Sequence, residues 1–313
     1  MDLFVGVTDG DWYELLASQP TLDEVNFWRP RDTSAFKALQ PGGLFLFKLH
    51  SPKNFIVGGG VYAHWSLLPV TLAWEAFEIR NGATSLVEMR QRIEKYKYRG
   101  QTPPPHEDYK IGCILLEQPF FFAETDWIPV PDDWHLNIVQ GKGYDTGTTV
   151  GMRLWTDVAE RMARKPASAF PVAVGDPDGQ PRFGEPILVR PRLGQGSFRV
   201  LVTDAYERRC AVTKERTLPV LEAAHIRPYW DGGEHRIDNG LLLRRDLHTL
   251  FDRGYVTVAA DLCLQVSRRL KEDFENGRDY YALHGRELWL PMPEADRPRQ
   301  DYLAWHRQER WLG

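Results

Sequence analysis

The sequence predicts an α+β protein of two domains. Its 313 residues are too many for one ordinary hydrophobic core, because single cores stop growing at about 250–300 residues. Short apolar runs bounded by Gly and Pro alternate with segments of helical periodicity, which favours a mixture of strands and helices. A Pro- and Gly-rich stretch lies between the two halves. We therefore expect domains at 1–160 and 197–313, joined by a linker at 161–196.

Three apolar runs predict a sheet in the first domain. Residues 42–50 (GGLFLFKLH), 55–65 (FIVGGGVYAHW) and 111–122 (IGCILLEQPFFF) are short and bounded by turn residues, which is typical of buried strands. Between the last two, residues 84–97 have apolar side chains at helical spacing. Thr84 and Ser85 precede that run and are candidates for its N-cap.

The second domain begins with a predicted helix at 197–209, with Ser197 as a candidate N-cap. The elements that follow it are a strand at 218–226, a turn-rich loop at 228–238 and a short return that opens at Asn239. A helix is then expected at 241–252. The order of strand, loop, return and helix brings the end of the strand close to the helix.

The net charge of −4 is unevenly distributed. Residues 1–160 contain 14 Lys and Arg against 21 Asp and Glu, whereas residues 161–271 contain 19 against 13. Phosphate contacts depend on local potential, so the basic segment is where a polyanion would bind. An Arg-rich but merely solvated surface gives the same counts. A hydrophobic content of 42% indicates a globular chain.

The three cysteines lie far apart and form no CxxC pair, so no structural zinc is expected. We interpret them as reduced, mostly buried thiols of a cytoplasmic protein. The first residues are acidic where a signal peptide is basic, and no apolar run reaches membrane-spanning length. We therefore expect no membrane partner.

Four polar residues of the second domain have the types that phosphodiester hydrolysis requires. His225, at a strand end, is a candidate general base, because the unperturbed pKa of imidazole is near neutrality. Asn239 is placed to orient the loop. His248 and Asp252 lie four residues apart on a helix, which suits a two-point clamp for Mg²⁺ or Mn²⁺. Each feature alone is more often structural: a strand-end His, a surface ion pair, an Asn before a Gly turn.

The same residues resemble the signature of the HNH nucleases, a superfamily built from two strands and a helix around one metal (ββα-metal). Segments 192–215, LEAAHIRP, NGLLLRRDLHTLFDRG and YLAWH are similar to a bacterial restriction-type branch, over about 120 residues. The resemblance implies that His225 is the general base, Asn239 the loop-orienting residue and His248 a metal ligand. Many relatives have a metal ligand where this chain has Ala224, so Asp252 or Glu222 would have to replace it.

The first domain resembles the EVE branch of the PUA-like fold, a mixed β-barrel related to SRA domains, on residues 27–62. The resemblance implies a reader that stacks a flipped, modified base between aromatic rings. The candidate pocket residues are Asn26, Phe27, Trp28, Arg29, Trp65, Gln140, Tyr144 and Asp145. The candidate contacts to the DNA backbone are Arg227, Arg244, Arg245 and Lys142.

Together the two resemblances imply a modification-dependent DNA endonuclease, similar to type IV restriction enzymes. Its substrate would be double-stranded DNA containing 5-methylcytosine or 5-hydroxymethylcytosine. A homodimer is expected, because one HNH site cuts one strand. Two other classes stay open. A nuclease inactivated at Ala224 would only bind nucleic acid, and a PUA-like reader is also compatible with RNA.

Overall fold

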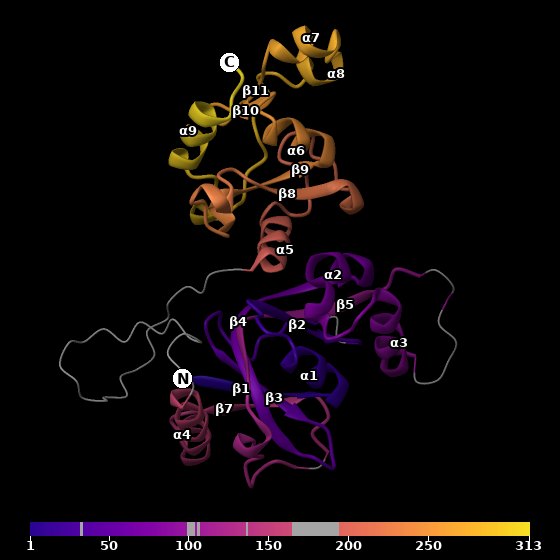
Figure 1. The fold of residues 1–313 in the computed structure, drawn as a ribbon, viewed down its shortest axis with the longest axis vertical. Coiled ribbons are helices and arrows are strands. Elements are labelled where there is room, and N and C mark those ends of the chain that lie inside the picture. The colour runs from indigo at the N-terminus through magenta and orange to yellow at the C-terminus, as the bar shows by residue number, and fades with distance from the viewer. Residues whose placement is uncertain (32–33, 99–103, 105–106, 136, 165–193) are drawn as a thin grey trace, which may run out of the picture. The chain divides into compact units, whose positions relative to one another are not determined.

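The computed structural model describes residues 1–31, 34–98, 104, 107–135, 137–164 and 194–313. Contacts within the chain divide it into two compact units, Met1–Pro191 and Arg192–Gly313 (Figure 1). Most of the predicted linker, at 165–193, lies outside the described residues.

The strands of the first unit are β1 (Asp2–Thr8), β2 (Glu24–Arg29), β3 (Leu44–Leu49), β4 (Phe55–Pro69), β5 (Lys110–Phe121), β6 (Ile128–Pro129) and β7 (Gly141–Asp145). The α-helices are α1 (Gly10–Ala17), α2 (Val70–Phe77), α3 (Leu86–Lys97) and α4 (Thr149–Ala163). Short 3₁₀ turns occupy η1 (Glu78–Asn81) and η2 (Glu124–Asp126).

The described strands of this unit form one mixed sheet in the order β2-β5-β4-β3-β1-β7, with β6 paired to β4. The β1–β3 pair is parallel and the other pairs are antiparallel. Among the described residues the order runs from β2 to β7 without closing, so the expected α+β class is confirmed but the PUA-like barrel is not.

Alternate side chains of β3 enter two cores on opposite faces of the sheet, as the period of a strand requires. Phe45 and Phe47 pack with Trp12 of α1, in a cluster rich in aromatic rings. Leu44 and Leu46 pack in a second cluster that includes Leu154 and Val158 of α4. The sheet is therefore covered by α1 on one face and by α4 on the other.

The three strands predicted for this unit are present as β3, β4 and β5, and the predicted helix is α3. Ser85 caps α3, because its side chain accepts a hydrogen bond from the backbone N–H of Glu88. Helix α4 was not anticipated and extends to Ala163, past the predicted end of the domain at 160.

The strands of the second unit are β8 (Leu221–His225), β9 (Gly240–Arg244), β10 (Val256–Val258) and β11 (Leu264–Val266). Its α-helices are α5 (Gln195–Ala205), α6 (Arg245–Asp252), α7 (Arg269–Phe274), α8 (Arg278–Tyr281) and α9 (Gln300–Glu309). The 3₁₀ turns are η4 (Leu218–Val220), η5 (Tyr229–Asp231), η6 (Ile237–Asn239) and η7 (Glu294–Asp296).

One core joins α5, the β8–β9 hairpin, α6 and α9. Two sequence-based expectations are wrong in detail. Residues 241–244 form strand β9 and not the start of a helix, because they pair with β8. Ser197 is not the N-cap of α5: the cap is Gly194, and Ser197 is buried inside the first turn.

The three cysteines are free thiols, and Cys113 and Cys210 are buried, as expected from the sequence. Within the described ranges, no helix combines the length and the apolar character needed to cross a bilayer.

Candidate active site

The β8–β9 hairpin places His225 and Asn239 at the same end of two paired strands. His225 is the last residue of β8 and pairs with Gly240, the first residue of β9. Asn239 immediately precedes β9, so the loop from 226 to 239 begins and ends at the same end of the two paired strands. Leu241, Leu242 and Leu243 anchor β9 in the core, which fixes the polar end of the hairpin relative to α6.

Asn239 is fully buried, and in the described part of the chain its side-chain amide is bonded to the backbone of this loop. Its Oδ1 accepts from the N–H of Arg227 at 2.9 Å, and its Nδ2 donates to the carbonyls of Arg227 and Glu234, each at 2.9 Å. These bonds satisfy a buried amide with backbone groups on both sides of the loop, which holds the loop in one conformation. This is the position that the sequence assigned to loop orientation.

The imidazole of His225 is enclosed on two sides. One face stacks on Phe198 of α5, with ring centroids 3.8 Å apart, and its Nε2 lies 2.9 Å from Nδ1 of His235. Burial, together with the charges that His235 and His248 would carry, lowers the pKa of His225 to about 4. The ring is therefore neutral near pH 7 and has a lone pair that can accept a proton.

His235 was not singled out from the sequence. It lies in the loop between η5 and η6, ten residues from His225 in the chain. Its ring also lies against Tyr229, whose ring is parallel to the imidazole at a centroid distance of 4.9 Å. The sequence signal nearest to this contact is the Gly232-Gly233 pair, which marks the loop as turn-rich.

The turn that carries Tyr229 is tightly built. Gly232 has a φ of +83°, and a Cβ on Gly233 would lie 1.9 Å from the carbonyl oxygen of Arg227, so both positions require glycine. Nε of Arg227 closes the turn by donating to the carbonyl of Asp231 at 2.6 Å. The turn leaves Trp230 81% exposed, beside the candidate active site.

His248 of α6 lies between two carboxylates. Its Nδ1 is 2.8 Å from Glu222 of β8, and its Nε2 is 3.3 Å from Asp252 one helical turn later. Arg245 also binds Glu222, at 2.7 Å. Although burial raises the pKa of Glu222, the hydrogen bonds from His248 and Arg245 more than offset this and lower it. Glu222 is therefore an ionised acceptor for the Nδ1–H of His248.

The donors around His248 fit a divalent cation at one ring nitrogen. Adjacent ligands of an octahedral ion at about 2.1 Å lie about 3 Å apart, which is close to the spacing between His248 Nε2 and Asp252. Glu222 is on the opposite nitrogen, as an orienting carboxylate would be. Across the described ranges no group of three or more His, Cys, Asp and Glu is arranged to hold a metal, and Ala224 contributes no donor.

A strand carrying the His, a loop ended by the Asn, a second strand and a helix carrying the second His occur here in that order. Residues 210–259 match the HNH endonuclease family. This HNH segment extends from Cys210 through α6 to the strand β10, and so contains every site residue of the second unit named so far except Phe198 of α5. No curated protein matches the chain. Among solved structures, the chain is similar to a modification-dependent TagI restriction endonuclease, with 14% identity and a TM-score of 0.28, over 99% of this chain and 81% of that one.

The four residues expected to contact the DNA backbone each have a partner within the protein. Arg227 binds the Asp231 carbonyl, and Arg245 binds Glu222. Arg244 binds both carboxylate oxygens of Asp246 at 2.7 Å. Lys142, in the first unit, is 2.6 Å from Asp133. Their role towards phosphate stays a prediction. To bind a phosphate, each side chain would have to release its present partner or bind the phosphate and that partner together.

A second candidate site is a hollow of about 360 Å³ in the first unit. Its aromatic lining comes from Trp12, Phe27, Trp28 and Tyr96. Its polar and charged lining comes from Thr8, Asp9, Arg29, Arg31, His50, Lys95 and Gln140. Aromatic rings combined with a few polar groups are typical of a site for a flat, polar ligand.

Half of the residues expected in the reader pocket meet at this hollow. Phe27, Trp28, Arg29 and Gln140 line it, and Arg29 is hydrogen-bonded to Gln140. The sequence missed Trp12, His50, Lys95 and Tyr96, because they come from separate parts of the chain that only the folded sheet brings together.

The other four expected pocket residues do not line the hollow. Asn26 is fully buried and donates to Asn81 at 2.9 Å, so it belongs to the core. Tyr144 is buried and donates to Asp133, and Asp145 accepts from the backbone of Gly147 in a turn. Trp65, on β4, packs against the aromatic core.

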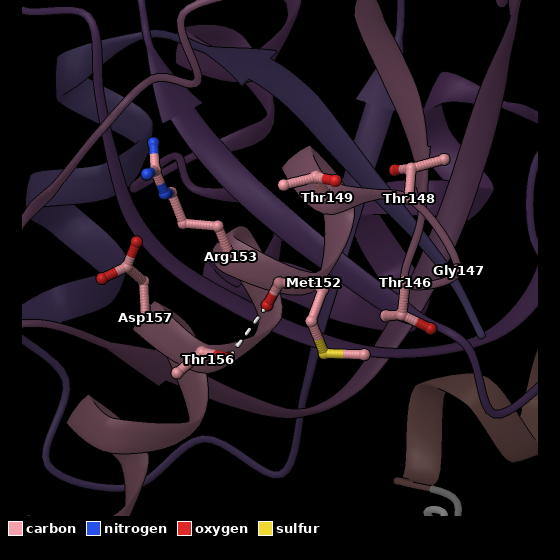
Figure 2. A pocket seen from close by; sticks show the side chains of 8 residues that line it. All are labelled: Thr146, Gly147, Thr148, Thr149, Met152, Arg153, Thr156 and Asp157. Atoms are coloured by element: carbon pink, nitrogen blue, oxygen red, sulfur yellow. Dashed lines mark hydrogen bonds between the residues drawn. The ribbon is translucent and has the colours of Figure 1, made fainter.

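Another hollow of the first unit, of about 580 Å³, lies at the start of α4 (Figure 2). Half of its eight lining residues are threonines, and the others are Gly147, Met152, Arg153 and Asp157. Within the figure the only hydrogen bond drawn is the one from Thr156 to the carbonyl of Met152, at 3.0 Å. None of the expected site residues lines this hollow.

Proposed function

We propose that this protein is a DNA endonuclease that recognises modified cytosine and hydrolyses a phosphodiester bond with one divalent metal ion. The observation that carries the proposal is the HNH segment, in which a neutral His225 lies at the end of a strand whose loop is held by buried Asn239. That arrangement supplies a base with a lone pair and a fixed orientation, which are the two requirements for deprotonating a water molecule.

In this proposal the polar residues divide the work. His225 accepts the proton of the attacking water. His248 and Asp252 would hold the cation, and Glu222 fixes the ring of His248 through its other nitrogen. A bound Mg²⁺ or Mn²⁺ would stabilise the charge that develops on the phosphate oxygens.

The hollow of about 360 Å³ that Trp28 lines is proposed as the reader for a flipped 5-methylcytosine or 5-hydroxymethylcytosine. Its volume is large enough for one base, and half-buried Trp28 offers a flat apolar face on which a base would stack, whereas Trp12 and Phe27 are buried and complete the lining. Asp9 would accept from the exocyclic amino group, and Arg29 and Arg31 would bind the flanking phosphates. An EVE-like, PUA-like origin for this unit belongs to the same proposal.

The test is a cleavage assay with the full chain. Plasmids carrying 5-methylcytosine, 5-hydroxymethylcytosine or no modification are incubated with the protein and Mg²⁺ or Mn²⁺. We expect metal-dependent cleavage of modified plasmid, and a loss of about a hundredfold or more in His225→Ala. Equal cleavage of all plasmids would remove the reader, and undiminished cleavage by His225→Ala would remove the assigned base. Nicked intermediates that disappear at higher protein concentration would support the expected homodimer.

A second candidate function is binding of modified DNA without cleavage. It is favoured by one observation: Ala224 offers no donor, and no three-donor group is present in the part of the chain that the structure describes. Selective binding of modified duplex with no product in either metal would support this candidate. RNA in the same binding assay tests the remaining alternative.

A further inference from the structure

His225 and His235 share one hydrogen bond, and this constrains the protonation of both rings. The Nε2 of His225 is 2.9 Å from the Nδ1 of His235, so one of these nitrogens carries the proton and the other accepts it. Near pH 7 the ring of His225 is neutral and carries a single N–H. The direction of this bond therefore decides which nitrogen of His225 has a free lone pair.

We propose that His235 is a positioning residue that selects the catalytic tautomer of His225, an inference that rests on the proposed role of His225 as general base. His235 accepts through Nδ1, which places the proton of His225 on Nε2. The lone pair of His225 is then on Nδ1, for which the described residues provide no hydrogen-bond partner. The opposite direction would put the proton on Nδ1 and leave no nitrogen able to deprotonate water.

The surroundings of His235 are built to hold its ring. Tyr229 stacks on the ring with an interplanar angle of 6°. The preceding residue, Glu234, is fixed through its carbonyl by Nδ2 of Asn239. Stacking holds the side chain of His235, and the hydrogen bond to Glu234 holds its backbone. The buried Asn239 therefore helps to position His235, and through His235 it also positions the ring of His225.

Two properties of His235 could matter, its acceptor nitrogen and its flat ring, and two substitutions separate them. In His235→Asn, the Oδ1 atom replaces Nδ1 as an acceptor but the ring that stacks on Tyr229 is lost. In His235→Phe, the stacking ring is kept and the acceptor is lost. A purely structural role predicts that Phe is tolerated better than Asn, whereas tautomer selection predicts the reverse.

The first measurement is the tautomer of His225 in the full chain, read from long-range ¹H–¹⁵N correlations of labelled histidine. His225→Ala identifies the signals. We expect the Nε2–H form in the wild type and in His235→Asn, and a mixture or the Nδ1–H form in His235→Phe. An Nδ1–H form in the wild type, or an unchanged Nε2–H form in His235→Phe, would overturn the proposal. This readout needs no cleavage, so it separates failure of this proposal from failure of the proposed function.

The second measurement is cleavage kinetics on the preferred plasmid. We expect His235→Phe to lower kcat by about ten- to a hundredfold with little change in KM, as is usual for loss of a residue that orients a reacting ligand. His235→Asn should stay within about threefold of the wild type. The reverse order of the two variants would overturn the proposal in favour of a stacking role.

Discussion

Asn239 binds both backbone polar groups of Arg227: its Oδ1 accepts from the N–H and its Nδ2 donates to the carbonyl, each at 2.9 Å. The two residues are twelve positions apart, and the loop between them carries Tyr229 and His235. The amide therefore closes the loop as a double bridge. An amide suits this bridge because it offers a donor and an acceptor on one short planar group.

The first prediction follows from this bridge. Asn239→Asp keeps the acceptor but loses both donations, and leaves the carbonyls of Arg227 and Glu234 facing a carboxylate. An unsatisfied buried polar group costs about 1–3 kcal/mol, so we expect a loss of roughly 2 kcal/mol or more in unfolding free energy. Cleavage should fall at least about tenfold. Urea unfolding and plasmid cleavage measure the two effects, and an Asp variant with wild-type cleavage would show that the bridge is dispensable.

The second prediction concerns the metal. Asp252→Ala should raise the Mn²⁺ concentration needed for half-maximal cleavage by about tenfold or more. The substitution removes one of the two groups proposed to bind the cation, and leaves only Nε2 of His248. Glu222→Gln should raise it by no more than about threefold, since the amide oxygen still accepts from Nδ1–H of His248. A metal titration of both variants decides. If Glu222→Gln is the more damaged, Glu222 is a direct ligand.

The third prediction concerns stability at acid pH. His306 of α9 is buried, with Nε2 3.0 Å from the carbonyl of Phe251 and Nδ1 2.8 Å from the hydroxyl of Thr257. The ring must be neutral to donate at one nitrogen and accept at the other. Burial lowers its pKa to about 4, despite the hydrogen bond to Phe251.

Because the folded pKa is below the unfolded value of about 6.5, the unfolded chain binds the proton first as the pH falls. The stabilisation is complete above about pH 6.5 and is lost towards pH 4, by up to about 3 kcal/mol. His306→Gln retains an amide donor near the Phe251 carbonyl but does not titrate. Since His225 also titrates, the measurement is the difference in unfolding free energy between the two proteins from pH 7 to pH 4. Parallel curves would contradict the assignment.

Local geometry was predictable from the sequence where one helix or one strand fixes it. His248 and Asp252 lie together because residues four apart share a helix face. The run Leu241–Leu243 was assigned wrongly, because three apolar residues suit the start of a buried helix as well as a buried strand. Pairing with β8, a tertiary contact, decides between the two.

Contacts between distant segments could not be predicted. Trp12, His50 and Lys95 meet at one hollow although they lie on α1, after β3 and on α3. Trp12 and His50 follow β1 and β3, so their meeting depends on the parallel pairing of these two strands, which no local pattern specifies. His235 was not predicted as a site residue for a related reason. Its contact with the ring of His225 arises from the fold of the loop and not from a regular spacing in the sequence.

The last prediction concerns the reader. Trp28 lines the hollow and donates through Nε1 to the carbonyl of Asn81 at 2.9 Å. This hydrogen bond fixes the orientation of the indole ring. Stacking of a base on an aromatic ring is worth about 1–3 kcal/mol. Trp28→Ala should therefore reduce the preference for modified over unmodified duplex by about tenfold, whereas Trp28→Phe, which keeps a flat face, should retain part of it.

The measurement is a fluorescence-anisotropy titration of matched duplexes with the full chain carrying His225→Ala, so that binding is read without cleavage. Trp65→Phe is the control, because Trp65 packs in the aromatic core and does not line the hollow. If the hollow reads the base, the Trp28 variants lose preference in the order Ala before Phe and the Trp65 variant keeps it. Loss of preference in Trp65→Phe alone would move the reader to β4, because Trp65 is not among the residues that line the hollow.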